Sequence, residues 1–361
     1  MGAYILRRLL LTIPTLVGIM LVNFTLTQFV PGGPIEAYIA KAQGEGDVLK
    51  SVTGSATDAG VDDGGAEQKY VGARGLPPEF IKQLEVQFGF DKPAYVRFLK
   101  MMGDYLRFDF GQSWFRSTSV VDLVIQKMPV SITLGLWSTL AAYIISIPLG
   151  IRKAVRDGTP FDTWTSGIII VGYAIPSFLF AVLLIVLFAG GSYWKVFPLR
   201  GLTSDDWSDL SLLGKVADYF WHITLPVVAS TISSFATLTL LTKNSFLDEI
   251  NKQYVMTARA KGLTERRVLY GHVFRNAMLI VIAGFPGLLI SVLFGGGLLI
   301  EVIFSLDGLG RMGYEAALQR DYPVVFGTLY TFGLMGLFIG IISDLTYMLV
   351  DPRIDFGTRD G

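Results

Sequence analysis

The sequence contains no cysteine and only two histidines, His222 and His272. The chain therefore has no disulfide, no thiolate nucleophile and no cysteine-built metal site, and two distant histidines do not suggest a zinc centre. Charged residues make up only 17% of the 361 positions, and the 30 Lys and Arg equal the 30 Asp and Glu. A formal net charge of zero gives no electrostatic argument for nucleic acid as a partner.

Recognisable catalytic and nucleotide-binding motifs are also missing. Gly214-Lys215 is followed by valine and lacks the earlier glycine of a phosphate-binding loop. The sequence has no H-E-x-x-H, no G-x-S-x-G and no paired carboxylates within its apolar stretches. We therefore expect no catalytic residue, no metal site and no cofactor bound by this chain.

Apolar sequence is what the chain has in abundance: 52% of its residues are hydrophobic and the mean hydropathy is +0.51. Six stretches reach the length of about 20 residues that a spanning helix needs, namely residues 9–30, 131–151, 163–189, 223–242, 277–300 and 324–350. They predict an all-α integral membrane protein with six transmembrane helices. The first stretch precedes a cleavage-like Ala40-Lys41-Ala42, but it exceeds the length of a signal-peptide core, so an uncleaved span is expected.

The loop charges predict the orientation. With the N-terminus inside, 14 Lys and Arg lie in inner segments, five in the two short outer loops and 11 in the long segment 31–130. Short cytoplasmic loops carry excess Lys and Arg, whereas long translocated segments largely escape this rule. We therefore expect both termini to be cytoplasmic.

The segments between the spans differ in character. Residues 44–75 are rich in Gly, Asp, Ala and Ser, which favours a mobile insertion. Residues 77–130 carry Phe80, Leu84 and Phe88 at helical spacing, which predicts a folded extracytoplasmic cap. A five-helix core (131–350) and a tail (351–361) follow the first helix (1–30) and the extracytoplasmic segment (31–130).

Seven Lys and Arg lie in the loop 243–275 between two apolar spans. Gly262 divides this loop into two helical pieces, so we expect a small folded structure that another protein can grip. Phe246, Ile250, Tyr254 and Ala258 recur at a spacing of four, and small Ala258 and Ala260 would let a partner approach closely. The alternative is that the loop cations face anionic lipid headgroups.

Polar groups within the spans are few. Asp344 lies within the last span and Glu301 at the end of another, and an intramembrane carboxylate is a functional candidate by default. The alternative for Asp344 is an ion pair with a neighbouring helix. Candidates for a translocation path are Pro176, Ser177, Ser233 and Ser234, and the alternative for these four is ordinary helix packing and hydrogen bonding.

A series of short motifs in a fixed order runs along nearly the whole chain apart from residues 44–75. The series is Arg7-Arg8 with Pro14, Pro31-Gly32-Gly33-Pro34, Asp109-Phe110-Gly111-Gln112-Ser113, Pro176-Ser177-Phe178, Glu301-Val302-Ile303-Phe304, Gly308-Leu309-Gly310, Arg320-Asp321-Tyr322-Pro323 and Asp351-Pro352-Arg353. In this order the chain resembles the transmembrane permease subunits of peptide-type ABC importers. Its opening is most similar to the microcin C and oligopeptide branch of that family.

The resemblance implies the type I ABC importer permease fold, with ATPase coupling through the loop 243–275. The family's docking motif has Glu-Ala-Ala followed by a glycine; here Gly262 aligns, and Met256 and Thr257 replace the Glu and the first Ala. Because of this departure, the family's specific glutamate contact does not carry over to this chain. Asp307 likewise stands where the family often has proline, so the family's turn geometry does not carry over at that position. The implied coupling residues are Tyr254, Thr257, Ala258, Arg259, Ala260, Lys261, Gly262 and Leu263.

The resemblance also implies the partners: a second homologous permease subunit, two ATP-binding cassette domains that bind ATP and Mg, an extracytoplasmic peptide-binding protein and the lipid bilayer of the bacterial inner membrane. Peptide is the expected substrate, with dipeptides, metal chelates and other small solutes as alternatives. A secondary transporter or channel would need coupling ions or a charged filter. An intramembrane enzyme would need a nucleophile–base or metal constellation, and no such pattern is present in the sequence.

Overall fold

The structure is a computed structural model, and it describes residues 2–29, 35, 78–87, 89–190, 193–291 and 297–350. Within these ranges the chain is helical and has no β-strand, only an isolated antiparallel bridge between Gln112 and Ser119. The insertion expected at 44–75 and the tail at 351–361 lie outside the described residues. The helices are α1 (Gly2–Phe29), α4 (Pro78–Gln87), α5 (Ala94–Tyr105), α6 (Val120–Val155), α7 (Pro160–Ala174), α8 (Ser177–Phe188), η1 (Trp207–Asp209), α9 (Leu212–Ile250), α10 (Gln253–Ala260), α11 (Glu265–Val268), η2 (Leu269–Val273), α12 (Phe274–Ala283), α13 (Phe285–Ser291), α14 (Gly297–Ile303), α15 (Leu309–Gln319) and α16 (Tyr322–Val350).

Within the described residues, five helical stretches are long and apolar enough to cross a membrane: Leu6–Phe29, Val120–Val155, Leu212–Ile250, Glu265–Ile290 and Tyr322–Thr346. A sixth candidate is the pair α7 and α8, which bends by 98° at its break. A proline drives the preceding residue out of the helical region, and Ile175 before Pro176 accordingly has ψ 119°. With this pair counted as one broken span, the prediction of six spans in an all-helical protein is confirmed.

Three expected boundaries differ from the structure. The fifth span was expected at 277–300, but helical structure already begins at Glu265 because Arg266 and Arg275 lie on exposed helix faces, where charge does not interrupt a helix. The cap was expected to reach residue 130, whereas α6 begins at Val120. The basic loop was expected from Lys243, which instead lies within α9.

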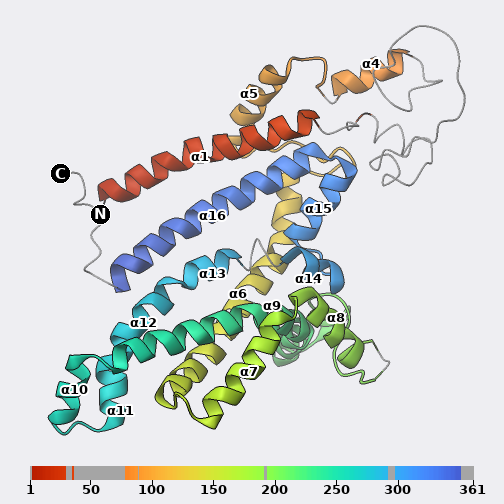
Figure 1. Ribbon diagram of the computed structural model, residues 1–361. Coiled ribbons are helices and arrows are strands. Elements are labelled where there is room, and N and C mark those ends of the chain that lie inside the picture. The colour runs from red at the N-terminus through yellow and green to blue at the C-terminus, as the bar shows by residue number, and fades with distance from the viewer. Residues whose placement is uncertain are drawn as a thin grey trace, which may run out of the picture. The chain divides into compact units, whose positions relative to one another are not determined.

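The chain divides into two compact units, one made of Met1–Arg8, Lys127–Arg311 and Met335–Gly361, the other of Leu9–Gln126 and Met312–Leu334. In the second unit α1 lies beside the N-terminal part of α16 (Figure 1). A Cβ on Gly333 would come within 3.1 Å of Leu16, so these helices approach closely. The Phe24 ring centroid lies 5.4 Å from that of Phe98 on α5 and 6.0 Å from that of Phe326 on α16, and these contacts attach the cap to both helices.

Two motifs that are distant in sequence meet in this second unit. The Asp321 carboxylate before α16 accepts a hydrogen bond from the Ser113 hydroxyl, and another at 3.1 Å from the Trp114 N–H. Arg116 pairs with Glu315 at 3.0 Å. Two motifs of the family series, Asp109–Ser113 and Arg320–Pro323, are therefore in contact. Their hydrogen bonds join the end of the cap to the turn between α15 and α16.

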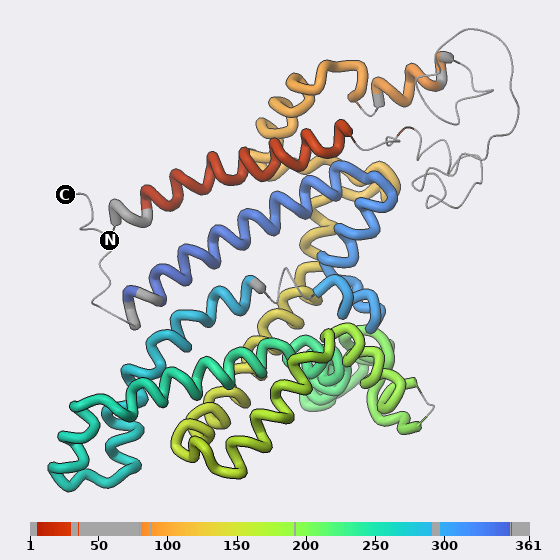
Figure 2. The backbone as a smooth tube through the Cα atoms, in the orientation of Figure 1, coloured from red at the N-terminus to blue at the C-terminus, as the bar shows by residue number. Residues whose placement is uncertain are grey.

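The first unit has two buried apolar clusters. One joins α6, α8, α9 and α14 and includes Leu134, Leu184, Leu225, Ile300 and Phe304. The other joins α6 and α9 to the chain that follows, from α10 to α12. Figure 2 shows this path: the backbone leaves α9, turns through α10 and α11 and returns along α12. The basic loop is therefore packed against the helices that carry it.

Candidate functional site

The basic loop turns at Gly262 through a defined helix C-cap. The Gly262 N–H donates to the Arg259 carbonyl at 2.9 Å and the Leu263 N–H to the Ala258 carbonyl at 3.4 Å. These two bonds are those of a Schellman motif, whose left-handed residue is usually glycine, and Gly262 has φ +80°. A Cβ at this position would have no atom within 4 Å, so the need for glycine is conformational and not steric. The expected break at Gly262 is confirmed, with α10 and α11 on either side.

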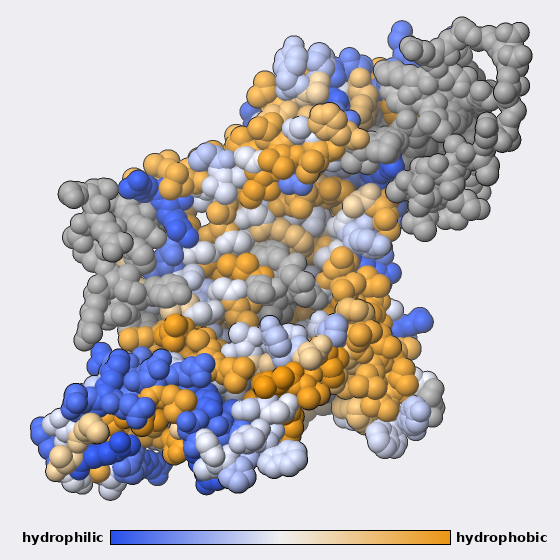
Figure 3. Space-filling model, viewed as in Figure 1, coloured by the Kyte–Doolittle hydropathy of each residue, from blue (hydrophilic) through white to orange (hydrophobic). Residues whose placement is uncertain are grey.

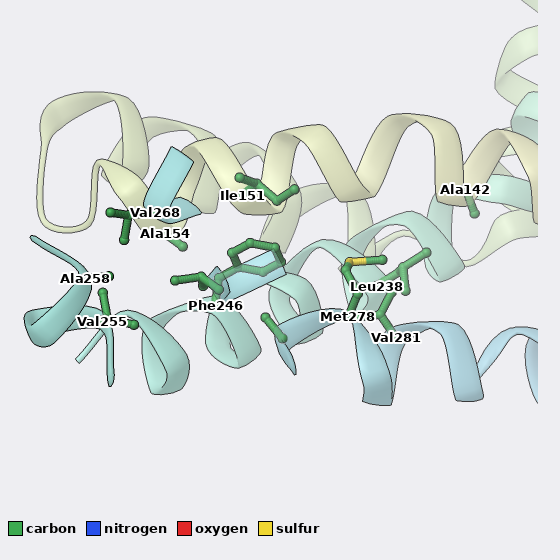
Figure 4. Packing of buried hydrophobic residues seen from close by; sticks show 12 residues of the cluster. Ala142, Ile151, Ala154, Leu238, Phe246, Val255, Ala258, Val268, Met278 and Val281 are labelled. Carbon is green, nitrogen blue, oxygen red and sulfur yellow. The ribbon is translucent and has the colours of Figure 1, made fainter. Parts of the chain in front are cut away.

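The inward face of the loop forms a small core of its own. Val255 and Ala258 of α10 and Val268 of α11 are buried against Phe246 of α9 and Ile151 of α6. Figure 4 shows these side chains converging between the helices. Removing their apolar surface from water holds the two short helices in place, since helices this short are not stable alone.

This packing bears on the expected role of Ala258. Its side chain is only 5% exposed and is covered by the chain's own residues, so it faces the core of the loop, and its part in coupling stays a prediction. The row from Phe246 to Ala258 does not lie on a single helix, because α9 ends at Ile250 and α10 begins at Gln253. The spacing correctly marked an apolar row, but that row faces the protein core.

The outward face of α10 consists of small and polar side chains with one large apolar residue. Met256 is 57% exposed, and Thr257, Ala260 and Lys261 are also exposed, whereas Tyr254 and Leu263 are half-buried. Figure 3 shows hydrophilic residues gathered over the α10–α11 loop. Of the expected coupling residues, the exposed ones are Thr257, Arg259, Ala260, Lys261 and Gly262.

Two of the loop's polar side chains are engaged within the chain. The Arg259 guanidinium donates to both carboxylate oxygens of Glu265, at 2.9 and 3.2 Å, and this pair links α10 to α11. The Tyr254 hydroxyl donates to Glu249 at 2.7 Å. Burial raises the pKa of Tyr254, and the hydrogen bond to the negatively charged Glu249 raises it further. The expected outward role of Arg259 thus competes with its bond to Glu265.

A groove of about 300 Å³ runs along one side of the loop. Its lining includes the apolar residues Val155 of α6 and Ile250 of α9, together with Arg259, Glu265, Arg266 and Tyr270. The groove adds a concave, partly basic surface to the exposed face of α10.

The four expected path residues lie at two places in the first unit. Pro176 and Ser177 form the junction of α7 and α8, while Ser233 and Ser234 are half-buried in the middle of α9. The Ser233 carbonyl accepts a hydrogen bond from Thr237 at 3.3 Å, as in ordinary helix packing. None of these four residues lines the groove beside the basic loop, so their role in a path stays a prediction.

The two carboxylates singled out in the sequence have partners. Asp344 lies 2.9 Å from the Arg8 guanidinium, which agrees with the ion-pair alternative. Glu301 is buried and accepts hydrogen bonds from the Ser131 hydroxyl and the Arg311 N–H, both at 2.7 Å. A Cβ on Gly308 would overlap the Glu301 carboxylate. The Glu301 and Gly308-Leu309-Gly310 motifs therefore belong to one structural arrangement. In it the Glu301 carboxylate lies at the positive N-terminal end of α15.

Up to six apolar spans among the described residues, two of them joined by a folded basic loop, define a multi-pass α-helical membrane protein. The chain belongs to the family of binding-protein-dependent transport system inner membrane components, whose model matches residues 146–356. The family expected from the sequence motifs is thereby confirmed, and the chain is a multi-pass inner membrane transport component.

Similar proteins cover the whole chain. The Peptidoglycan transport system permease protein YejB of Agrobacterium fabrum is 63% identical over 363 residues, with 100% of both chains covered. The Inner membrane ABC transporter permease protein YejB of Escherichia coli O157:H7 is 58% identical, covering 99% of this chain and 100% of that protein. The Oligopeptide transport system permease protein AppB of Bacillus subtilis is 33% identical, again over 99% and 100%.

Proposed function

We propose that this chain is the non-catalytic permease subunit of an ATP-driven peptide importer. It pairs with a second homologous permease, and two ATP-binding cassette domains bind ATP and Mg²⁺ on the cytoplasmic side. An extracytoplasmic peptide-binding protein delivers the cargo to the outer side, where the cap formed by α4, α5 and the Gln112–Ser119 turn receives it. The family match and the names of the permease relatives support this proposal.

The basic loop is the observation on which the proposal rests. A loop that is rigidified by its own core and exposes Met256, Thr257, Ala260 and Lys261 is suited to receive another protein's surface. The loop charges support a cytoplasmic position for it, with both termini on the same side. ATPases that close on ATP push this face, and the push reaches the spans through α9.

The cargo class rests on the relatives. One is named for peptidoglycan and another for oligopeptides, so we propose peptides, cell-wall peptides included. Dipeptides, metal chelates and other small solutes are the alternatives. Uptake by the reconstituted complex of an oligopeptide library, a muropeptide and a metal chelate, each measured by mass spectrometry, separates these classes. Uptake of the chelate alone would exclude peptides.

Ala260→Trp tests the docking face. Ala260 is exposed on α10, so tryptophan is tolerated by the fold but overlaps a closely apposed partner surface. We expect the variant to insert normally and to lose co-purification of the ATPase and peptide uptake. Ser208→Trp is the control, because Ser208 is exposed in η1, away from the loop. ATPase binding and uptake at wild-type level in Ala260→Trp would contradict the assignment.

A further inference from the structure

A buried ionic cluster lies where α6, α7 and α9 meet. Lys153, in the last turn of α6, is 0% exposed. Its ammonium group donates to the Asp162 carbonyl at 2.8 Å, the Thr165 hydroxyl at 2.7 Å and the Ser166 hydroxyl at 2.8 Å. All three acceptors belong to the first two turns of α7, so the three N–H donors of one lysine fix the start of α7 to the end of α6.

The Asp162 carboxylate joins α9 to the same point. One of its oxygens lies 2.9 Å from the Lys153 ammonium, and the other accepts a hydrogen bond from Lys243 of α9 at 2.7 Å. Lys243 also lies 2.7 Å from Asp157 in the α6–α7 turn. Two cations and two anions from four segments therefore form a neutral quartet around Asp162.

Close helix packing adjoins the cluster. A Cβ on Gly150 of α6 would lie 2.6 Å from the Thr242 Cβ and 2.9 Å from the Thr239 carbonyl oxygen of α9. The backbones of α6 and α9 thus approach closely one turn before Lys153 and next to Lys243. The ionic quartet and this contact together hold α6, α7 and α9 in a fixed arrangement where they meet.

Stability alone does not account for this arrangement. Buried ion pairs contribute little more than apolar residues of the same size, because desolvation of the charges offsets their attraction. Their directional bonds, however, fix the relative positions of the helices that carry them. The cluster is therefore better suited to holding a geometry than to raising stability.

The position of the cluster connects it to the candidate site. Lys243 lies seven residues before the end of α9 at Ile250, about 10 Å along the helix axis, and α10 begins at Gln253. On the other side, α7 leads from Asp162 to the break at Pro176 and then to α8. The end of α9 that carries the basic loop is thus connected, through Lys243 and Asp162, to the broken span.

We propose that Lys153, Asp162 and Lys243 are positioning residues that transmit movement of the α10–α11 loop to α7 and α8. The inference rests on the proposed function, because it says how a displacement of the loop by an ATPase reaches α7 and α8. The cluster contacts neither cargo nor nucleotide. Its role is to make α7 move together with α9.

Lys243→Met tests the route, because it removes the α9 charge and keeps a side chain of similar length. The complex with the second permease, the ATPases and the binding protein is reconstituted in vesicles with an oligopeptide library as cargo. We expect Lys243→Met to keep ATPase binding and ATP hydrolysis stimulated by the binding protein, while peptides imported per ATP fall by roughly tenfold. Lys243→Arg restores this ratio, since arginine reaches the same carboxylates.

Two controls make the result decisive. Lys215→Met is the same substitution on α9, outside the cluster and over the Trp207 ring, and should leave the ratio unchanged. If Lys243→Met fails to assemble, Lys243→Gln replaces it, because glutamine is also uncharged but keeps an amide that can donate a hydrogen bond. A wild-type ratio in Lys243→Met, or in Lys243→Gln where that variant replaces it, overturns the inference. Absence of stimulated hydrolysis in the wild-type complex would instead overturn the proposed function.

Discussion

Substitution of Gly262 gives the most direct measurement of how the loop geometry serves docking. Gly262 has φ +80°, and a Cβ there would meet open space, so the cost of a side chain comes from backbone conformation alone. An L-residue in the left-handed region costs about 1–2 kcal/mol, and a β-branched residue costs more. In the free variant the loop can relax out of the left-handed turn; if docking requires the turn, the strain is restored on binding and is subtracted from the binding free energy.

The expected losses form a graded series. Gly262→Ala should weaken ATPase binding by about tenfold, because 1.4 kcal/mol corresponds to a factor of ten. Gly262→Val should weaken it by about a hundredfold, since a β-branched residue at positive φ costs on the order of 3 kcal/mol. Gly262→Asn should lose least, because asparagine tolerates the left-handed region.

The assay is titration of the purified ATPase against the permease complex in nanodiscs, read by light scattering or calorimetry. Gly271→Ala is a matched control in the same region: a Cβ at Gly271 also meets open space, but its φ is not positive. This control should bind like the wild type. Equal affinities for Gly262→Ala, Gly262→Val and Gly271→Ala would show that the turn at Gly262 does not determine docking.

Two further predictions concern orientation and the α14–α15 corner. The chain has no cysteine, so Ser208→Cys and Lys261→Cys, both at exposed positions, can each be labelled singly. An impermeant reagent added to intact cells should label position 208 and not 261; the reverse pattern would invert the proposed topology. Glu301→Ala removes the acceptor for Ser131 and Arg311 and should lower stability by on the order of 3 kcal/mol, seen as a reduced Tm in detergent. Glu315→Ala, a more exposed carboxylate, is the comparison; an equal Tm for both variants would contradict the structural role of Glu301.

The sequence predicted those features that depend on neighbouring residues. The break at Gly262 is of this kind, because a Schellman motif is built from a few consecutive residues and one left-handed position. The bend at Pro176 is another, since a proline restricts the residue before it whatever surrounds the helix. The six spans follow equally directly from length and hydropathy.

The exposed face of α10 could not be predicted in the same way. Small and apolar residues at a spacing of four suit either a buried core or a docking surface, and Ala258 proved to belong to the core. The choice depends on α6, whose Ile151 and Ala154 lie about a hundred residues earlier in the chain and cover that side of the loop. The exposed side is then the one with Met256 and Thr257, where the family motif is not kept.

Lys153 shows why the ionic cluster was missed. A hydropathy reading counts it with Arg152 and Arg156 as an inner loop charge, yet it is buried on the last turn of α6, while Lys243 lies on α9 and not in the loop. Nothing local distinguishes a lysine that faces lipid headgroups from one that meets Asp162, since the carboxylate belongs to another helix. Asp162 in the first turn of an apolar helix was the available signal, because a buried carboxylate requires a cation close by. The cost of burying these charges supports the positioning role that we propose for the cluster, which lies where three helices meet, near the end of α9 that carries the loop.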